Sequence, residues 1–145
     1  MKKLILFLLI TSSLFSQTFF TLDNLKSLRI YMVASTDLIT IEEKATIKEN
    51  VIKRLAAAGF IFGEPDATNF MVKIQTVDIE DSHAIHIQIA LAEDVITSRP
   101  DNIHTFAFTY FLDDFIESDN PYTDITESVD FLLTEFLDSY KDDNE

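Results

Sequence analysis

Residues 84–92 read AIHIQIALA, and this stretch decides the fold because its side chains alternate between two kinds. Every second residue is a large aliphatic one: Ile85, Ile87, Ile89 and Leu91. The residues between them are polar or small: His86, Gln88 and Ala90. Successive side chains of a strand point to opposite faces of a sheet, so this period of two indicates a strand with one strongly apolar face.

Three further stretches show the same alternation, over residues 28–34, 70–76 and 105–110. In the last of them, Phe106, Phe108 and Tyr110 share one face, and we expect them in the core rather than stacked on a ligand. The connections between the strands are predicted as an acidic turn at 78–82 and a longer connection at 93–102. An acidic loop interrupted by Phe115 and Ile116 is predicted over residues 113–121.

Two segments have the spacing of amphipathic helices. Thr40 and Glu43 form a capping-box pattern before the first, which is predicted over residues 41–58 and is followed by Gly59 as a stop. Its apolar stripe consists of Ile47, Val51, Leu55 and Ala58. Asp124, with Glu127 three residues later, is predicted to cap the second helix. That helix has an apolar stripe of Ile125, Val129, Leu132, Phe136 and Tyr140.

The predicted order of elements is therefore β-α-β-β-β-α. Each helix has one apolar stripe and each strand one apolar face, so the economical arrangement is an α+β two-layer sandwich. We expect a four-stranded, mostly antiparallel sheet with both helices on one face. A right-handed first crossover makes the first two strands parallel. No linker or repeat divides the chain, and residues 17–145 are predicted to form a single α+β domain.

The first seventeen residues, MKKLILFLLITSSLFSQ, have the order of a secretory signal peptide. Two lysines precede an apolar run over residues 4–10, and that run is about half the ~20 residues that a membrane-spanning helix needs. We expect a signal peptide over residues 1–16 that is cleaved after Ser16, with Ser13 as the alternative. The protein is then periplasmic or secreted, and soluble without a membrane span in its mature chain.

The negative charge of the chain is concentrated in its second part. Residues 17–62 carry five acidic and six basic side chains, whereas residues 63–145 carry twenty acidic and three basic ones. One face or end must therefore be strongly negative, and it would repel DNA, RNA and acidic lipid surfaces. The acidity serves either solubility in an ion-rich compartment or the docking of a basic partner or of cations.

Few groups in the sequence are suited to catalysis. The absence of cysteine excludes disulfides, zinc–thiolate sites and cysteine nucleophiles. The only glycines after the leader, Gly59 and Gly63, form no phosphate-binding loop. Ser82 beside His83 is interpreted as a polar turn, because a catalytic triad is defined by geometry rather than by adjacency in sequence. We therefore predict no enzyme activity and no cofactor.

A metal site is the remaining possibility for a chemical site. If the last two predicted strands pair as a hairpin, His83 and Asp81 approach the Asp113–Asp114 end. Carboxylates with one histidine suit calcium or manganese better than zinc. The candidate ligands are Asp81, His83, Asp113 and Asp114, and the alternative is that all four are ordinary surface side chains.

Small residues are expected on the sheet face that the helices leave uncovered: Ala84, Ala90, Ala92, Thr105, Ala107 and Thr109. They are either filler on an exposed face or a means for a second sheet or a partner to approach closely. The edge strands offer a related route, because an unpaired edge can accept a strand from another protein.

Two short motifs carry a resemblance. The first helix ends Leu55-Ala-Ala-Ala58-Gly59-Phe60, and the chain closes with Phe136-x-x-x-Tyr140-x-x-x-Asn144. In these features and in its leader, the chain resembles a broad group of small exported bacterial α/β proteins with no assigned function. The resemblance covers roughly residues 28–144 and implies no catalytic residue. This chain has no tryptophan in its last strand, where Phe106 or Phe108 would take that place.

The expected function is a non-enzymatic periplasmic interaction module that binds another envelope protein and no nucleic acid. The sheet edge, the uncovered sheet face and the acidic surface are the three candidate docking regions. The alternative is an envelope protein that binds a small ligand or a divalent cation at the Asp81, His83 and Asp113 region.

Overall fold

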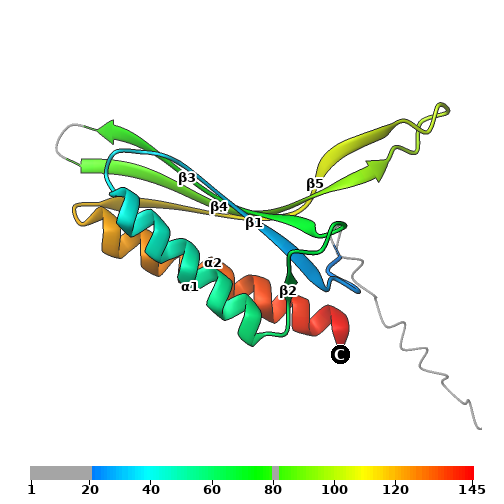
Figure 1. The fold of residues 1–145 in the computed structure, drawn as a ribbon. Coiled ribbons are helices and arrows are strands. Elements are labelled where there is room, and N and C mark those ends of the chain that lie inside the picture. The colour runs from blue at the N-terminus through cyan, green and yellow to red at the C-terminus, as the bar shows by residue number, and fades with distance from the viewer. Residues whose placement is uncertain (1–20, 80–81) are drawn as a thin grey trace, which may run out of the picture.

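The computed structural model describes residues 21–79 and 82–145, and the predicted leader over residues 1–16 lies outside them. The elements in chain order are β1 (Ser27–Ser35), α1 (Ile41–Ala57), β2 (Ile61–Phe62), β3 (Thr68–Ile79), β4 (Ser82–Ile96), β5 (His104–Ser118) and α2 (Pro121–Asn144). Both helices lie beneath the same face of one sheet (Figure 1). The α+β class and the placement of the helices on one side are confirmed.

The sheet has five strands in the order β2-β1-β3-β4-β5. β1 pairs in parallel with β2 and with β3, whereas the β3–β4 and β4–β5 pairs are antiparallel. The predicted parallel pairing of the first two long strands is therefore confirmed. The predicted number of four strands is wrong, because Ile61 and Phe62 form a short fifth strand at the edge beside β1. Two residues are too few to show an alternation in the sequence.

The N-terminus of α1 is closed by the predicted capping box. The Thr40 hydroxyl accepts a hydrogen bond from the Glu43 backbone N–H at 3.1 Å, and the Glu43 carboxylate accepts one from the Thr40 N–H at 2.7 Å. These bonds satisfy two backbone donors that a helix end otherwise leaves without partners. After the helix, Gly59 adopts a φ of +96°, in the left-handed region that glycine enters at little cost.

α2 begins at Pro121, with Asn120 at the N-cap position and no side-chain hydrogen bond that caps the helix. Asp124 does not cap the helix; its carboxylate accepts a hydrogen bond from the Ser118 hydroxyl. The same hydroxyl oxygen accepts one from the Asn120 backbone N–H at 3.0 Å. The predicted capping role of Asp124 is wrong because proline suits the first helical position, which places Asp124 one turn inside the helix.

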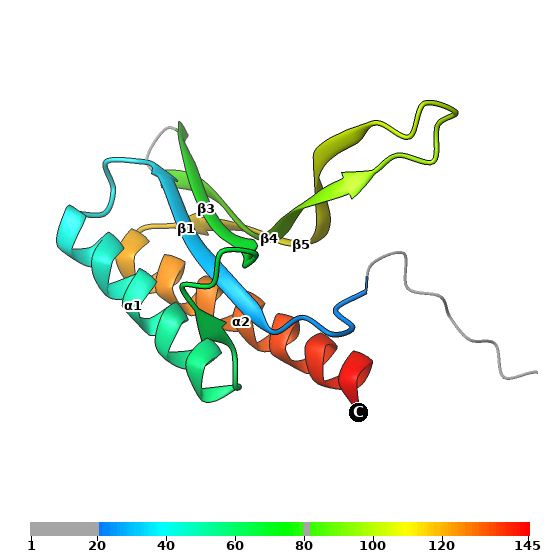
Figure 2. The same cartoon turned by 45° about the vertical axis from the view of Figure 1, so that its right-hand side comes forward.

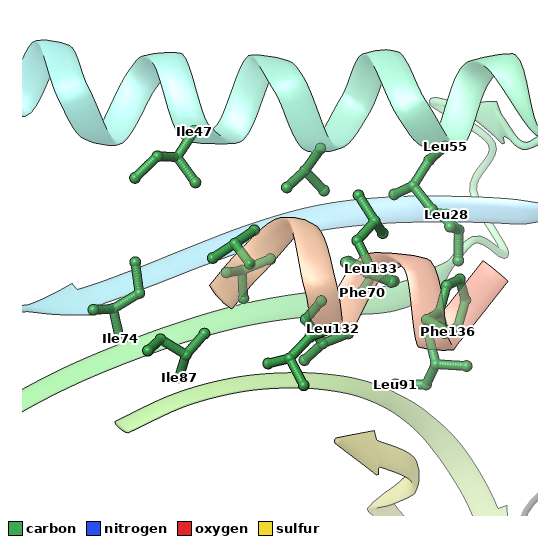
Figure 3. Close-up of a cluster of buried hydrophobic side chains, with 14 of the residues drawn as sticks. Leu28, Ile47, Leu55, Phe70, Ile74, Ile87, Leu91, Leu132, Leu133 and Phe136 are labelled. Atoms are coloured by element: carbon green, nitrogen blue, oxygen red, sulfur yellow. The ribbon is translucent and has the colours of Figure 1, made fainter. Parts of the chain in front are cut away.

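Large apolar side chains fill the space between the helices and the sheet (Figure 3). Phe136 of α2 is fully buried among them, with its ring centroid 5.1 Å from that of Phe70 and 5.6 Å from that of Tyr110. The other buried residues labelled in the figure are Leu28, Ile47, Leu55, Ile74, Ile87, Leu91, Leu132 and Leu133. Burial of each such side chain contributes about 1.5–3 kcal/mol, so this layer is the main source of stability.

A β-bulge interrupts the β4–β5 hairpin next to Leu91. Leu91 pairs with Tyr110, but the following residue of β4 pairs with Phe108, so Thr109 has no pairing partner on β4. An extra residue reverses the side-chain alternation beyond it. Tyr110 therefore stays in the core, whereas Phe106 and Phe108 are 57% and 55% exposed. The prediction that all three line the core is wrong for the two phenylalanines.

The strands β4 and β5 are both longer than predicted. The acidic loop expected over residues 113–121 is strand as far as Ser118, and the connection expected over 93–102 shortens to residues 97–103. Asp113 pairs with Gln88, and Asp114 with Ile87. The carboxylates are accommodated because each has a hydrogen-bonding partner on a neighbouring element, which a reading of isolated acidic residues does not reveal.

The end of α2 binds the beginning of the described chain through a set of hydrogen bonds that we call the terminal clasp. The Asn144 side chain donates to the Leu22 carbonyl at 3.0 Å and accepts from the Asn24 backbone N–H at 3.0 Å. The Asp143 carboxylate accepts from the Leu22 N–H at 2.7 Å. Leu22 is buried. The Phe136, Tyr140 and Asn144 motif is therefore structural, since the Tyr140 ring also packs against that of Phe60, with centroids 4.6 Å apart and planes tilted by 49°.

Substitution Asn144→Ala is expected to destabilise the domain by about 1–3 kcal/mol. The loss follows from removing both clasp bonds of one side chain and leaving the Leu22 carbonyl without that donor. Urea unfolding monitored by circular dichroism measures it, with the exposed neighbour Asp142→Ala as the matched control. Equal midpoints for the two variants would show that the clasp contributes nothing.

Tyr110 should make stability depend on pH at the alkaline end. Burial raises the pKa of its phenol above the ordinary 10.0, opposed by the hydrogen bond to Ser139 and assisted by Asp143 and Glu135. The folded state therefore favours the protonated phenol. Its contribution is complete below pH 10 and is lost as the pH rises through the raised value. Tyr110→Phe is expected to flatten the fall in melting temperature between pH 9 and 11; an unchanged fall contradicts this assignment.

Candidate interaction surface

The structure separates the residues predicted as metal ligands. Asp81 lies outside the described residues. The Nδ1 atom of His83 lies 2.8 Å from a carboxylate oxygen of Asp78, not of Asp113. Asp114 accepts a hydrogen bond from the Ser128 hydroxyl of α2 at 2.6 Å, so it points to the helix side. His83 is opposite Ser118 and five residues from the partner of Asp113, about 16 Å along β4.

Asp113 takes part in a different cluster, on the face of the sheet away from the helices. Its carboxylate lies 2.7 Å from Nε2 of His86 and accepts from the Gln88 amide at 2.9 Å. The His86 ring stacks on Phe115, with centroids 4.4 Å apart and planes 10° apart. In the described part of the chain, no group of three or more histidine, aspartate or glutamate side chains could hold a metal ion.

The two residues of the predicted polar turn do not act on each other. The Ser82 hydroxyl donates to the Glu117 carboxylate at 2.6 Å, while His83 is paired with Asp78. Ser82 and His83 thus have separate partners on β5 and β3. The predicted turn position is wrong for both, because they pair with Ile79 and Asp78 as the first residues of β4.

The uncovered face of the sheet, which we call the open face, is built from cross-strand rows. The pairings place side chains of neighbouring strands side by side on it. The rows are Arg29, Asn69, Ala92 and Phe108; Tyr31, Met71, Ala90 and Phe111; Val33, Lys73, Gln88 and Asp113; Ser35, Gln75, His86 and Phe115; and Val77, Ala84 and Glu117. Of the small residues predicted for this face, Ala84, Ala90 and Ala92 are present, among exposed aromatic and aliphatic residues. The prediction is wrong for Thr105 and Ala107, because beyond the bulge Phe106 and Phe108 take this face and the residues between them point to the other side.

Beyond the bulge, residues 92–108 form a projecting hairpin that we call the arm. The arm rises from the sheet on the side away from the helices (Figure 2). Phe108 pairs with Ala92 and Phe106 with Asp94, so these phenylalanines share the side that continues the open face. A cleft of about 320 Å³ lies at the corner, lined by residues that include Arg29, Ala92 and Phe106.

Glu93 fixes the base of the arm. Its carboxylate accepts a hydrogen bond from the Thr68 hydroxyl of β3 at 2.9 Å and another from the hydroxyl of Thr109, the extra residue of the bulge. One side chain of β4 therefore links all three strands where the hairpin bends. Hydrogen bonds to an ionised carboxylate are roughly twice as strong as neutral ones, which favours a defined angle at the corner.

Acidic residues are gathered on the opposite, helical layer. α2 carries seven of them against one lysine, Lys141: Asp124, Glu127, Asp130, Glu135, Asp138, Asp142 and Asp143. The rows of the open face, by contrast, carry Arg29 and Lys73 against Asp113 and Glu117, with no formal net charge when His86 is neutral. The uneven charge of the sequence thus becomes a difference between the two sides of the molecule.

β5 forms one edge of the sheet, and no described strand pairs with its outer side. It is 15 residues long and contains no lysine, arginine or proline. α2 packs against β4 and β5, so the acidic layer lies directly beneath this edge. Natural proteins usually protect an edge strand from unwanted pairing with other chains by keeping it short or by placing proline, bulges or charged side chains on it. Here acidic residues are the charged groups along the edge, towards its end.

The exposed aromatic residues of the open face were missed by the sequence interpretation. A signal was present in β1, where Tyr31 and Val33 alternate with Ile30 and Met32, so that both faces of one strand are apolar. A strand with two apolar faces indicates a sheet that is covered, or able to be covered, on both sides. For Phe106 and Phe108, the bulge removed any such signal.

No family model matches the chain, and no curated protein matches it significantly. The resemblance to small exported proteins therefore stays a prediction. In the described part of the chain, neither helix has the length and hydrophobicity needed to cross a membrane.

Proposed function

We propose that this is an exported, non-enzymatic interaction protein that binds an extended basic segment of another envelope protein along the outer edge of β5. The observation that carries the proposal is the length of that edge together with its acidic surroundings. No described strand pairs with the outer side of this 15-residue strand, and its acidic half over residues 112–118 offers a row of backbone donors and acceptors there. An incoming strand can satisfy them by extending the sheet.

The charges around the edge define the chemistry of the partner. Asp113 and Glu117 lie on the open-face side of β5, Asp114 lies on the helix side, and Asp119 follows the strand. An added strand would run between these carboxylates and beside the acidic α2. Lysine or arginine at alternating positions would face them, while apolar residues between would meet Phe115 or the rim of the core.

The same charges disfavour pairing of β5 with β5 of a second copy over its acidic half. Like charges placed opposite each other on paired strands are destabilising. Attraction for a basic strand and repulsion of its own copy together give selectivity, because specificity is a difference between two binding free energies.

Strand addition can be tested with a twelve-residue peptide in which lysine and valine alternate. Isothermal titration calorimetry is expected to show binding that weakens with salt. The same peptide with all its backbone nitrogens methylated keeps its charges but loses the donors for the ladder. It is expected to bind at least about tenfold more weakly, a difference of 1.4 kcal/mol or more. Equal binding of both peptides would leave only charge attraction and overturn strand addition.

Charge reversals locate the site. The double variant Glu117→Lys and Asp119→Lys is expected to weaken binding of the unmethylated peptide about tenfold. Glu127→Lys with Asp138→Lys, two exposed positions of α2, is the matched control with the same change in net charge. A control that loses as much affinity as the edge variant would place the peptide on the helical layer instead.

The exported location rests on the leader pattern of residues 1–16. Mass spectrometry of the protein recovered from its native envelope fraction is expected to give an N-terminus at Gln17. Recovery from the cytoplasmic fraction of a protein that still begins at Met1 would overturn the exported location. It would leave the proposal of peptide binding unaffected.

A further inference from the structure

We infer that the open face, together with the inner side of the arm, binds a second copy of this chain to form a two-fold symmetric dimer. This inference goes beyond the binding of a basic strand, because it uses another surface and another partner. The face is uncovered by any described element, and the arm extends it on one side (Figures 1 and 2).

The apolar area of this surface matches what a dimer needs. Eight of its large side chains are between 44% and 76% exposed: Tyr31, Val33, Val77, Ile96, Phe106, Phe108, Phe111 and Phe115. Since an aromatic side chain offers about 150–250 Å², the exposed fractions of the five aromatic residues alone correspond to roughly 400–700 Å² per copy, and the three aliphatic residues add to this area. One partner in a standard protein–protein interface buries about 800 Å². A scattered set of exposed residues on a monomer would not be gathered on one side in this way.

The distribution of charge favours a second copy over an acidic or basic partner. The chain has a net charge of −14, yet the rows of the open face are formally neutral. Stacking two open faces places both acidic α2 layers on the outside, as far apart as the molecule allows. A basic partner would find its complement on the helical layer or the β5 edge rather than here. With Asp94 of the arm included, the surface carries one negative charge per copy, a small part of the total, and its aromatic and aliphatic residues are complementary to those of a second copy.

The shape of the surface also suits a two-fold arrangement. Ala84, Ala90 and Ala92 lie on the interior strand β4, on either side of His86 and Gln88, and at these positions a second sheet can approach to the usual spacing of about 10 Å. In a two-fold dimer every contact occurs twice: where one residue contacts a second residue of the partner, that second residue contacts the first one of the partner. Phe106 and Phe108 of each arm then close over the Tyr31 side of the other copy, which fills the corner.

Sedimentation velocity on the purified protein over a wide range of concentration tests the inference. The wild-type protein is expected to sediment as a dimer, with monomer appearing on dilution. Tyr31→Glu and Phe108→Glu, placed on different strands of the surface, are each expected to weaken the dimer at least tenfold. Phe131→Glu on α2 is the matched control, since Phe131 is equally exposed, at 56%, on the opposite layer. It is expected to leave the dimer unchanged.

Each outcome decides the matter. A wild-type protein that stays monomeric at every concentration overturns the inference, as does a dimer that persists in both open-face variants with native circular dichroism. A dimer broken by Phe131→Glu alone places the interface on the helices and overturns it too. Titration of the lysine–valine peptide into the Tyr31→Glu variant separates this result from the proposed function. If the variant is monomeric and still binds the peptide, the β5 site does not depend on the dimer.

Discussion

Substitution Phe136→Ala is expected to lower the free energy of unfolding by about 3–5 kcal/mol. The Phe136 ring is fully buried and meets aromatic rings from three other elements or connections, with Phe60 at 6.0 Å, Phe70 at 5.1 Å and Tyr110 at 5.6 Å. Removing it leaves a cavity that rigid neighbours can close only in part. Domains of this size are stable by about 5–15 kcal/mol, so a large share of the stability is lost.

Urea denaturation measures this effect as a fall in the midpoint of roughly 2 M. The matched control is Phe131→Ala, because Phe131 lies on the same helix but is 56% exposed. That variant is expected to stay within about 0.5 kcal/mol of the wild type. Similar losses for the two variants would show that α2 does not present Phe136 to the sheet.

Substitution Ile74→Asp is expected to unfold the domain. Ile74 lies on β3 with no exposed surface and points to the helices. An ionised carboxylate there would have neither water nor a charged partner, and the cost exceeds about 4 kcal/mol. The expected result is loss of the cooperative thermal transition, or recovery of the protein only in insoluble form.

Gln75→Asp is the sharpest control for that prediction, because it makes the same residue one position later. Gln75 is exposed on the open face, between Ser35 and His86 of the neighbouring strands. Its substitution is expected to change stability by no more than about 0.5 kcal/mol. If Gln75→Asp were the more damaging of the two, the assignment of the covered and open faces would be reversed.

The elements that carry a strong period could be predicted from the sequence, and those that break it could not. The alternation of Ile85, Ile87 and Ile89 and the stripe of α1 both depend on local spacing, which the fold preserves. The bulge at Thr109 depends on how β5 pairs with β4, so no pattern within residues 104–118 alone predicts it. Secondary-structure propensity fails similarly at Asp113, which was expected in a loop. It lies in a strand because its carboxylate has partners on β4, His86 and Gln88.

The candidate sites show the same division. The uncovered face and the sheet edge were both expected from the two-layer arrangement, which needs only the apolar faces to be counted. The proposed grouping of His83 with Asp113 failed because it depended on the exact register of β4 and β5. Register moves a residue by about 3.3 Å per step, and His83 and Asp113 differ by five steps.

The terminal clasp has a consequence for the chain while it is being made. The bond between Leu22 and Asn144 joins residues 122 apart, so it cannot form until the last turn of α2 has left the ribosome. At about 5–20 residues per second, the first strand waits roughly ten seconds for the helix that completes its surroundings. For most of that time the nascent polypeptide lacks Phe136 as well, so its interior stays unfinished until α2 has been synthesised.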